Sequence, residues 1–209
     1  MKVFQYEFPD MLIKVSNNRK YLEDLCAGKV YMNESGYFRK LEDTYRGDKF
    51  DGKCVISFEN HTGEFMELGP EESPEERIKI PLDFIQNFTV GFKGDNKIPL
   101  YCCSQLSEHI LRKETEFSLK FKEEFISEME QFGSYAIFSK VEFLQNMLDY
   151  IDDNQLGGKW GAVSYVDIHS EYHIEILNDE NRNQYNVFFK KDLSYQWQNE
   201  WRIILVSNG

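Results

Sequence analysis

The stretch "IKIPLDFIQNFTVGFKGDNKIPLYCCSQL", Ile78–Leu106, holds three apolar runs with only short polar breaks between them. The runs IKIPLDFI, FTVGFKG and KIPLYCCSQL have the length of strands and are rich in β-branched and aromatic residues. No segment between them is long enough for the crossover helix that parallel neighbours require. The stretch therefore favours an antiparallel sheet.

Short apolar runs bounded by turn formers recur on both sides of this stretch, and they predict further strands. Lys53–Leu68 is expected to form a hairpin that turns at Gly63. The other expected strands are Val3–Phe8, KVYMN (29–33), SYAIFSK (134–140), WGAVSYVDI (160–168), HIEILN (173–178), NVFFKK (186–191) and Trp201–Val206.

Three segments have the apolar spacing of helices. Asn17–Gly28 begins with a capping asparagine and ends at a glycine. VEFLQNMLDYID (141–152) is expected to be ended by Gly157-Gly158. A long irregular connection, which is not one of the three, leaves open a further short helix around Phe38–Glu42. The segment Thr115–Gln131 carries a stripe expected to face the core, made by Phe117, Phe121, Phe125 and Met129.

The order of these elements predicts the fold class. The strands follow one another without the regular βα alternation of a parallel fold, and about three helices interrupt them. Aromatic residues make up 15% of the chain, which is ample material for a core. We therefore expect one α+β domain over residues 1–209, with mostly antiparallel sheet.

Charge and the N-terminal segment limit which partners and which compartment are expected. Net charge is −12, from 36 acidic and 24 basic residues, so the surface should repel nucleic acid, which stays open only as a modified target. MKVFQYEFPD lacks the apolar core of a signal peptide, and no apolar run reaches membrane-spanning length. A cytoplasmic protein without a membrane partner is expected.

Common reactive motifs are missing from the sequence. The cysteines Cys26, Cys54, Cys102 and Cys103 have no CxxC spacing, so reduced thiols are expected. The four histidines have no metal-ligand spacing, so no metal site is expected. The chain also lacks the phosphate-binding patterns GxxxxGK[ST] and GxGxxG and the hydrolase pattern GxSxG.

The closing stretch "YQWQNEWRIIL", Tyr195–Leu205, is the main candidate for chemistry. In an extended strand Gln198, Glu200 and Arg202 would point to the same side. Neighbouring tryptophans would remove water from Glu200 and raise its basicity, whereas an ion pair with Arg202 would reverse that effect. The alternatives of a catalytic acid and an ion pair at a sheet edge both remain open.

Several segments together resemble a known family. NRKYLEDLCAGKVYMN, YFRKLEDTYRGDKFDG, the run ending in CCSQLS, and FFKKDLSYQWQNEWRIIL follow the order found in phage and bacterial proteins of unknown function associated with abortive infection. That family closes with Lys…Tyr…Glu-x-Glu-Trp-Arg, and Gln198 stands where its first Glu is common. The resemblance covers roughly a third of the chain, and it implies a role in conflict between phage and host.

A second, distant resemblance is to ADP-ribosyltransferases, which close with Gln/Glu-x-Glu at the start of a late strand. It implies an NAD site in which Glu200 stabilises the oxocarbenium-like state and Gln198 positions the acceptor. It also implies a cation on the diphosphate, an aromatic ring stacked on nicotinamide, and a middle-strand serine. The residues that would take these cofactor-binding roles, with Asn33 beside them, are Arg46, Tyr31 or Phe38, and Ser104.

Each of these residues also has an ordinary structural interpretation. Arg46 would be a solvated loop residue, Tyr31 a half-buried strand aromatic, and Phe38 an anchor of its loop. Asn33 and Ser104 would serve as turn or cap residues. The leading hypothesis is an ADP-ribosyltransferase-like protein of phage or phage-defence origin that cleaves NAD and modifies a macromolecule. The alternative is a non-enzymatic acidic protein that binds or inhibits a partner protein.

Overall fold

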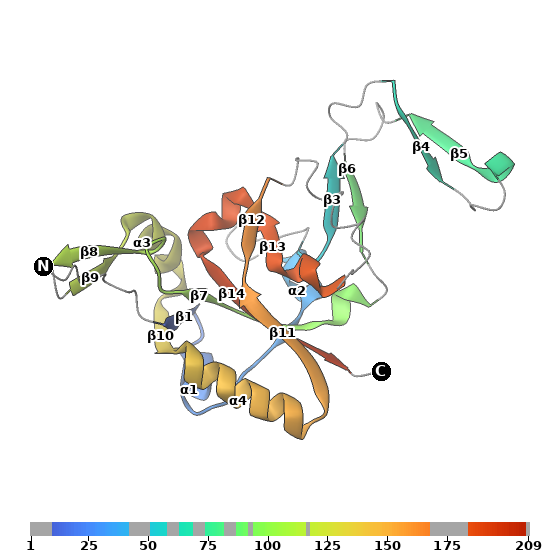
Figure 1. Cartoon of the computed structure of the whole chain (residues 1–209). Helices are drawn as coiled ribbons and strands as arrows, with labels where there is room; N and C mark the ends of the chain where they lie inside the picture. Colours follow the sequence, from blue (N-terminus) through green and yellow to red (C-terminus); the bar gives the residue numbers. More distant parts are fainter. Residues whose placement is uncertain are drawn as a thin grey trace, which may run out of the picture.

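The structure is a computed structural model (Figure 1) that describes residues 10–41, 51–57, 63–68, 74–81, 87–91, 94–115, 118–167 and 184–207. Two of the expected strands, Val3–Phe8 and HIEILN (173–178), lie outside the described residues. In Figure 1 the central strands cross the middle of the molecule, and the long helix α4 lies along one side of them.

One antiparallel sheet forms the centre of the fold. Its strands run in the order β10-β1-β7-β14-β11, and β2 pairs with the start of β7. Each pairing in this sheet is antiparallel, which confirms the expected α+β class with mostly antiparallel sheet. The strands are β1 (Met11–Ser16), β2 (Asn33–Glu34), β7 (Pro99–Gln105), β10 (Ser134–Ser139), β11 (Leu156–Ala162) and β14 (Glu200–Ser207).

Helix α4 (Lys140–Asp153) covers one face of this sheet. Its buried residues Phe143, Met147 and Ile151 recur every four positions, so they share one side of the helix. They pack against residues that alternate along the strands, including Tyr101 of β7 and Trp201 of β14. The other helices are α1 (Arg19–Cys26), α2 (Ser35–Lys40) and α3 (Glu123–Met129).

Helix α1 confirms the signals that predicted it. The side chain of Asn18 accepts a hydrogen bond from the Lys20 backbone N–H at 3.1 Å, as an N-cap residue does. Leu22 is buried. The chain leaves the helix through Gly28, whose φ of +80° favours glycine.

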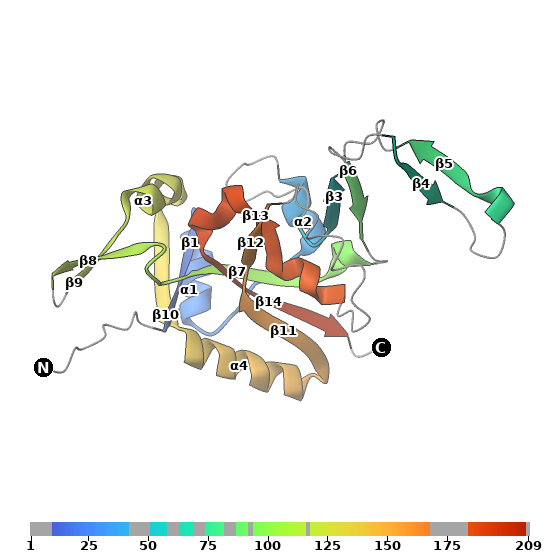
Figure 2. The same ribbon diagram turned by 45° about the horizontal axis from the view of Figure 1, so that its top comes forward.

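The remaining strands form two-stranded sheets, which Figure 2 shows around and beyond the central sheet. The β4–β5 ribbon projects farthest from the central sheet in both ribbon views. Short 3-10 helices join several elements, among them Gln184–Phe189 (η5) and Leu193–Gln198 (η6). The pairs are β3 (Cys54–Ser57) with β6 (Asn87–Val90), β4 (Phe65–Leu68) with β5 (Ile78–Pro81), β8 (Leu111–Thr115) with β9 (Ser118–Phe121), and β12 (Ser164–Val166) with β13 (Lys190–Asp192).

The expected hairpin Lys53–Leu68 is wrong. Its two strands do form, as β3 and β4, but β3 pairs with β6 and β4 pairs with β5. Gly63 does have the positive φ of a turn residue, +80°. A local turn signal fixes the backbone at that residue only, whereas partner choice depends on strands that follow later in the chain.

The expected helix Thr115–Gln131 is also too long. Strand β8 ends at Thr115, Phe121 belongs to β9, and only Glu123–Met129 is α-helical. A spacing of four is even, so it places side chains on one face of a strand as well as on one face of a helix. Phe117 lies outside the described residues, whereas Phe125 is buried and stacks on Phe121 with ring centroids 5.4 Å apart.

Three smaller boundaries differ from expectation. Of KVYMN only Asn33 lies in a strand, and most of NVFFKK belongs to η5, with β13 beginning at Lys190. Gly157 and Gly158 belong to β11 and do not end α4. A Cβ on Gly158 would come within 2.7 Å of the Ile151 side chain, so glycine here permits close packing of α4 on the sheet.

The sheet opens between β1 and β7, and this opening positions the candidate site. The two strands pair only at Leu12–Gln105 and Ile13–Ser104, whereas β1 stays paired with β10 as far as Ser16. Beyond this point the Lys14 ammonium donates to the Cys102 backbone carbonyl at 2.5 Å. A side chain thus replaces the strand-to-strand hydrogen bonds at the opening.

Candidate functional site

A buried polar network lies on the face of β14 that is turned away from α4. Glu200 and Arg202 share that face, as the strand alternation predicts, while Trp201 and Ile203 point toward α4. Glu200 is 6% exposed and Arg202 is 1% exposed. Strand β14 lies between β7 and β11, so the predicted ion pair exists in the sheet interior and not at its edge.

Arg202 is saturated by acceptors. Its Nε donates to Glu200 Oε1 at 2.6 Å, and its Nη2 donates to Glu200 Oε2 at 3.3 Å. Its two Nη atoms also donate to the two carboxylate oxygens of Asp51, at 2.7 and 2.9 Å, and Nη1 donates to the Phe188 carbonyl at 2.6 Å. The planar fork of a guanidinium suits such a two-sided arrangement between carboxylates.

Asp51 reaches the network from the loop before β3. A Cβ on the next residue, Gly52, would overlap the Phe188 ring, so glycine lets the loop approach η5 closely. Arg39 of α2 donates to the Asp51 carbonyl at 3.1 Å and pairs with Asp95 at 3.3 Å. These contacts fix Asp51, which is 2% exposed, against Arg202.

Lys191 joins the two candidate catalytic residues. Its ammonium donates to Gln198 Oε1 at 2.8 Å and to Glu200 Oε2 at 3.0 Å. Gln198 ends η6, and Asn199 has a left-handed φ of 41°. Gln198 and Glu200 are therefore not joined by extended backbone. They nevertheless meet at one cation, and Lys191 also lies over the Tyr195 ring at 4.6 Å.

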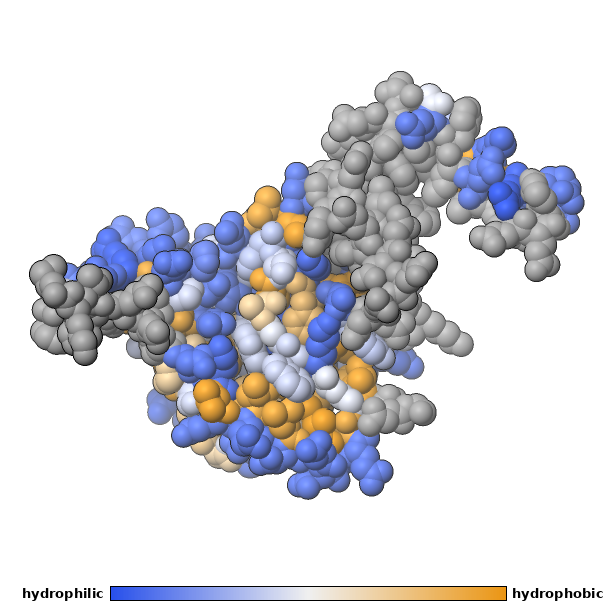
Figure 3. Space-filling view, in the orientation of Figure 1, coloured by the Kyte–Doolittle hydropathy of each residue, from blue (hydrophilic) through white to orange (hydrophobic). Residues whose placement is uncertain are grey.

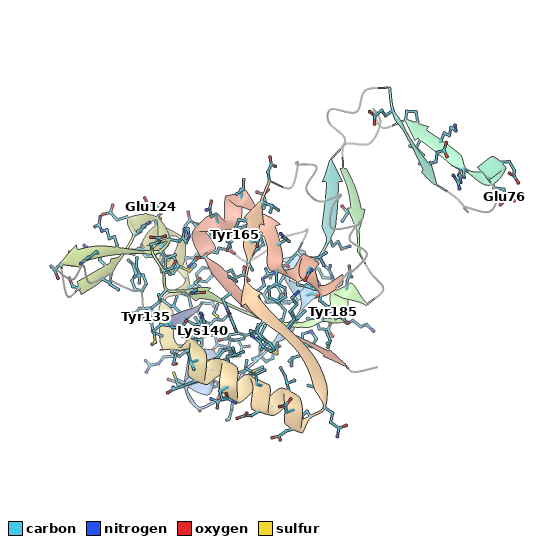
Figure 4. All side chains as sticks on the ribbon, in the orientation of Figure 1. Glu76, Glu124, Tyr135, Lys140, Tyr165 and Tyr185 are labelled. Carbon is cyan, nitrogen blue, oxygen red and sulfur yellow. The ribbon has the colours of Figure 1, made fainter. Side chains whose placement is uncertain are left out.

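Strands β12 and β13 bring a tyrosine to the same place. Tyr165 pairs with Lys191 in the parallel β12–β13 register, and its hydroxyl oxygen accepts the Glu200 backbone N–H at 2.7 Å. Figure 4 labels Tyr165 on β12, over the middle of the sheet. Burial raises the pKa of Tyr165, so its hydroxyl stays neutral.

The Glu200 carboxylate stays ionised in this setting. Burial raises its pKa, but the charges of Arg202 and Lys191, with hydrogen bonds from Arg202 and the Cys102 thiol, hold the pKa of Glu200 well below its usual 4.5. Of the two effects weighed from the sequence, the ion pair prevails over desolvation. The indole of Trp201 packs on Phe143 on the other face, so it does not surround the carboxylate.

Ser104 of β7 lies directly across from Glu200 in the strand register and is 7% exposed. It is a strand residue and not the cap of a turn. Ser104, Gln198, Glu200 and Lys191 all line one cavity of about 140 Å³. The structure therefore brings together the predicted catalytic pair and the predicted middle-strand serine.

Three of the other predicted residues, Tyr31, Asn33 and Phe38, line a second cavity of about 390 Å³. Tyr31 precedes β2 and is 63% exposed, so it is not a half-buried strand aromatic. Its ring stacks on Tyr21 of α1 at 5.6 Å with an interplanar angle of 4°. Asn33 pairs with Leu100 in β2, and Phe38 in α2 packs edge-on against Tyr37. Arg46 lies outside the described residues.

The two cavities adjoin, because the same four residues line both of them. Lys14 is the charged member of this set, and it lies at the opening between β1 and β7. No ion pair of Lys14 occurs among the described residues, and its ammonium lies over the Tyr101 ring at 4.9 Å. The residues shared by the cavities are Lys14, Val15, Phe38 and Phe132.

Sequence reasoning missed Lys14, Asp51, Tyr165 and Lys191. The one available signal for Lys14 was a charge inside the apolar run MLIKVS, where a strand flanked by neighbours on both sides has no reason to carry a lysine. Lys191 stood in the quoted closing segment FFKKD, but nothing distinguished it from Lys190. Asp51 and Tyr165 meet Arg202 and Glu200 only through long-range folding.

Metal and thiol chemistry receive no support from the residues that the structure describes. That part of the chain has no cluster of His, Cys, Asp and Glu that could hold a metal ion. Cys26, Cys102 and Cys103 are free thiols without a disulfide, and burial raises the thiol pKa values of Cys102 and Cys103. Among the described residues, no helix is long and apolar enough to cross a membrane.

Comparisons with protein-family models, with curated proteins and with solved structures found no match for this chain. A function for the protein therefore has to be inferred from the geometry of the two adjoining cavities and of the network at Glu200.

Proposed function

We propose that the two adjoining cavities bind NAD and that the protein is an ADP-ribosyltransferase-like enzyme of phage or phage-defence origin. One observation carries the proposal: the ionised Glu200 and Ser104 line one cavity, Tyr31 and Phe38 line the next, and Lys14 lines both. The larger cavity, about 390 Å³, falls within the range of small-molecule sites, which is roughly 300–1,000 Å³.

The chemistry requires an anion beside a developing positive charge. The bond between ribose C1′ and the nicotinamide nitrogen breaks, and its electron pair leaves with nicotinamide. A nucleophilic atom of the acceptor then bonds to C1′ and loses its proton to solvent. Glu200 is suited to stabilise the intermediate positive charge, because its neighbours keep it ionised and fixed before the substrate arrives.

The Glu200 carboxylate already accepts three hydrogen bonds, and these bear on how substrate would reach it. Arg202 donates to both oxygens, and Lys191 donates to Oε2. In this proposal a ribose hydroxyl shares Oε2 with Lys191 or displaces its ammonium. Lys191 is the donor that can move, because its stem is flexible whereas Asp51 also holds Arg202. Displacement would also release Gln198 to position the acceptor.

Lys14 supplies a cation in the position that the diphosphate needs. It stands between the cavity that holds Glu200 and the cavity that holds the stacked pair Tyr21–Tyr31. A dinucleotide that spans both cavities would bring its phosphates to this point. In this proposal Lys14 takes the part that the sequence resemblance assigned to Arg46. We expect the activity in the cytoplasm, where NAD is present and thiols stay reduced.

A second candidate is a non-enzymatic acidic protein that binds a partner protein. The saturation of Glu200 favours it, because Arg202, Lys191 and Asp51 would then be a purely structural network inside the sheet. The net charge of −12 would give such a protein a surface suited to a basic partner.

Calorimetric titration of NAD distinguishes the two candidates. The enzyme proposal predicts heat and a thermal shift with wild type, and clearly weaker binding by Lys14→Met. The matched control is Lys122→Met, a lysine that lines neither cavity and should bind NAD as wild type does. At about millimolar NAD even very weak binding would be detected. If wild type then shows neither heat nor a thermal shift, the enzyme proposal is removed and the binding protein is favoured.

A further inference from the structure

We propose that a second copy of this chain pairs antiparallel with strand β10, so that two central sheets join into one. Strand β10 is the last strand at its end of the sheet, and within the described residues its sheet partner is β1 alone. Its other edge carries backbone N–H and C=O groups that could bond a further strand. This inference does not depend on the proposed function.

Strand β10 lacks the devices that usually protect a sheet edge. Its sequence SYAIFS has no charged residue and no proline. Its register with β1 runs without a bulge from Ser134 to Ser139. Edge strands of natural proteins commonly carry lysine, proline or a bulge that prevents pairing with another chain.

The edge also exposes apolar side chains. Tyr135 is 62% exposed and Ile137 is 43% exposed, and the two share one face because they are two positions apart. They lie opposite Val15 and Ile13 of β1, so they continue the apolar layer beneath α3 to the rim of the sheet. Figure 4 labels Tyr135 at the side of the molecule away from Tyr185.

The opposite end of the sheet is different. Strand β11 carries Lys159 and three glycines within LGGKWGA, and Figure 1 draws it as a strongly curved strand. A charge, weak strand formers and curvature all oppose pairing with another chain. The comparison selects β10 as the edge for a partner.

A second copy fits this edge better than an arbitrary strand does. The chain has a net charge of −12, so two copies repel wherever their acidic surfaces meet, but β10 is uncharged. In an antiparallel twofold pair centred on Ala136, Tyr135 of each copy lies opposite Ile137 of its partner. Aromatic and β-branched side chains form favourable cross-strand pairs, and the small Ala136 lies on the axis.

Sedimentation equilibrium of wild type and two charge variants tests the interface. Wild type is expected at twice the monomer mass, Ile137→Lys at the monomer mass, and the control Val141→Lys at the dimer mass. Val141 is an apolar residue on α4 that is more exposed than Ile137, at 63%, and it lies outside the strand. A monomeric wild type, or a dimer that survives Ile137→Lys, overturns the proposal.

A cysteine pair tests the register independently, in a Cys26→Ser background that removes an exposed thiol. Directly opposed residues have Cα atoms about 4.5–5.5 Å apart, which a disulfide can span. Ala136→Cys should therefore give a covalent dimer under mild oxidation. Ser134→Cys should not, because its partner in this register is Phe138. Equal cross-linking of both variants, or of neither, contradicts the twofold centred on Ala136.

Discussion

The two faces of strand β14 are both buried but are stabilised by different physics. Toward α4, Trp201 and Ile203 are 3% and 0% exposed and pack in an apolar cluster. Away from α4, Glu200 and Arg202 are buried just as deeply, with Asp51 and Lys191 as partners. Burial of apolar area stabilises the fold for any side chain of suitable shape, whereas a buried charge is tolerated only while its partner stays in place.

The two sides of the sheet also differ in how they meet the exterior and in which of them could carry function. Figure 3 shows hydrophobic residues gathered on the surface near α4 and β11, so the apolar side of the fold reaches the exterior. The charged side does not, because Arg202 is 1% exposed and makes all its contacts inside. Function is expected on the charged side, since that side presents the buried, ionised Glu200 to a cavity.

The largest expected effect comes from removing Arg202. Arg202→Ala leaves Asp51 and Glu200 as buried carboxylates without their main cation, which should reduce the free energy of unfolding by about 3–5 kcal/mol or more. The control Arg112→Ala removes an arginine that is 50% exposed and pairs with Glu123 at 3.7 Å. That change should cost only about 0–1 kcal/mol. Urea denaturation measures both, and similar losses would contradict the distinction.

The face that carries the network is not polar throughout, and a second pair of variants sharpens this point. Phe125 of α3 is 4% exposed in an apolar cluster with Ile13 and Ile110. Phe125→Ala should cost about 3–5 kcal/mol, as for a large buried side chain. Phe121 of β9 is only partly buried, so Phe121→Ala should cost clearly less. Thermal melts that rank the two in the opposite order would contradict this placement.

The pH dependence of stability separates the two faces of β14. The folded pKa of Glu200 is lowered from its usual 4.5, so its contribution is fully present above that value and is lost as pH falls toward the folded pKa. Wild type should therefore lose stability in acid. In Glu200→Gln this part of the acid dependence should be absent, because glutamine does not titrate there.

The matched control is Met147→Ala, on the α4 side of the sheet. Met147 is 6% exposed and uncharged, so its loss should cost about 2–5 kcal/mol at every pH at which the protein folds. Urea denaturation at about pH 7 and about pH 4 measures the three proteins. If Glu200→Gln and wild type lose the same free energy between these values, Glu200 is not the source of the acid dependence.

The sequence predicted the fold class well but not the strand partners. Alternation within β14 placed Glu200 and Arg202 on one face, and the Asn18 cap and Gly28 marked the ends of α1. The hairpin and the long helix were wrong, because a turn residue and a spacing of four are local facts. They do not specify that β3 pairs with β6, or that Phe121 belongs to a strand.

The candidate site also has residues that the sequence could identify and residues that it could not. Ser104, Gln198 and Glu200 could be named from their order in the chain, and they meet at one cavity. The partners that set the charge state of Glu200 could not be named with the same certainty. Arg202 was a visible neighbour of Glu200. Lys191 reaches Glu200 from β13, and Asp51 reaches Arg202 across a sequence separation of 151 residues. Arg202 lowers the pKa of Glu200 most, and long-range packing adds the effect of Lys191.

The ion pair of Glu200 with Arg202 is buried, so Glu200→Gln carries a cost in stability as well as in activity. Glu200 is buried with Arg202 and Lys191, so the variant leaves Lys191 short of a charged acceptor. Glutamine keeps one oxygen acceptor, so a loss of about 1–3 kcal/mol is expected. Activity of this variant is therefore to be measured at a temperature at which circular dichroism shows it folded.

Release of nicotinamide from NAD tests the central claim most directly, because it depends on the ionised Glu200. Wild type is expected to release nicotinamide in proportion to enzyme concentration. Folded Glu200→Gln should release it at least about a hundredfold more slowly, the scale for losing one preorganised electrostatic group, while still binding NAD. The control Glu142→Gln, an exposed acid on α4, should match wild type. No release by folded wild type, or equal release by Glu200→Gln, would contradict the account.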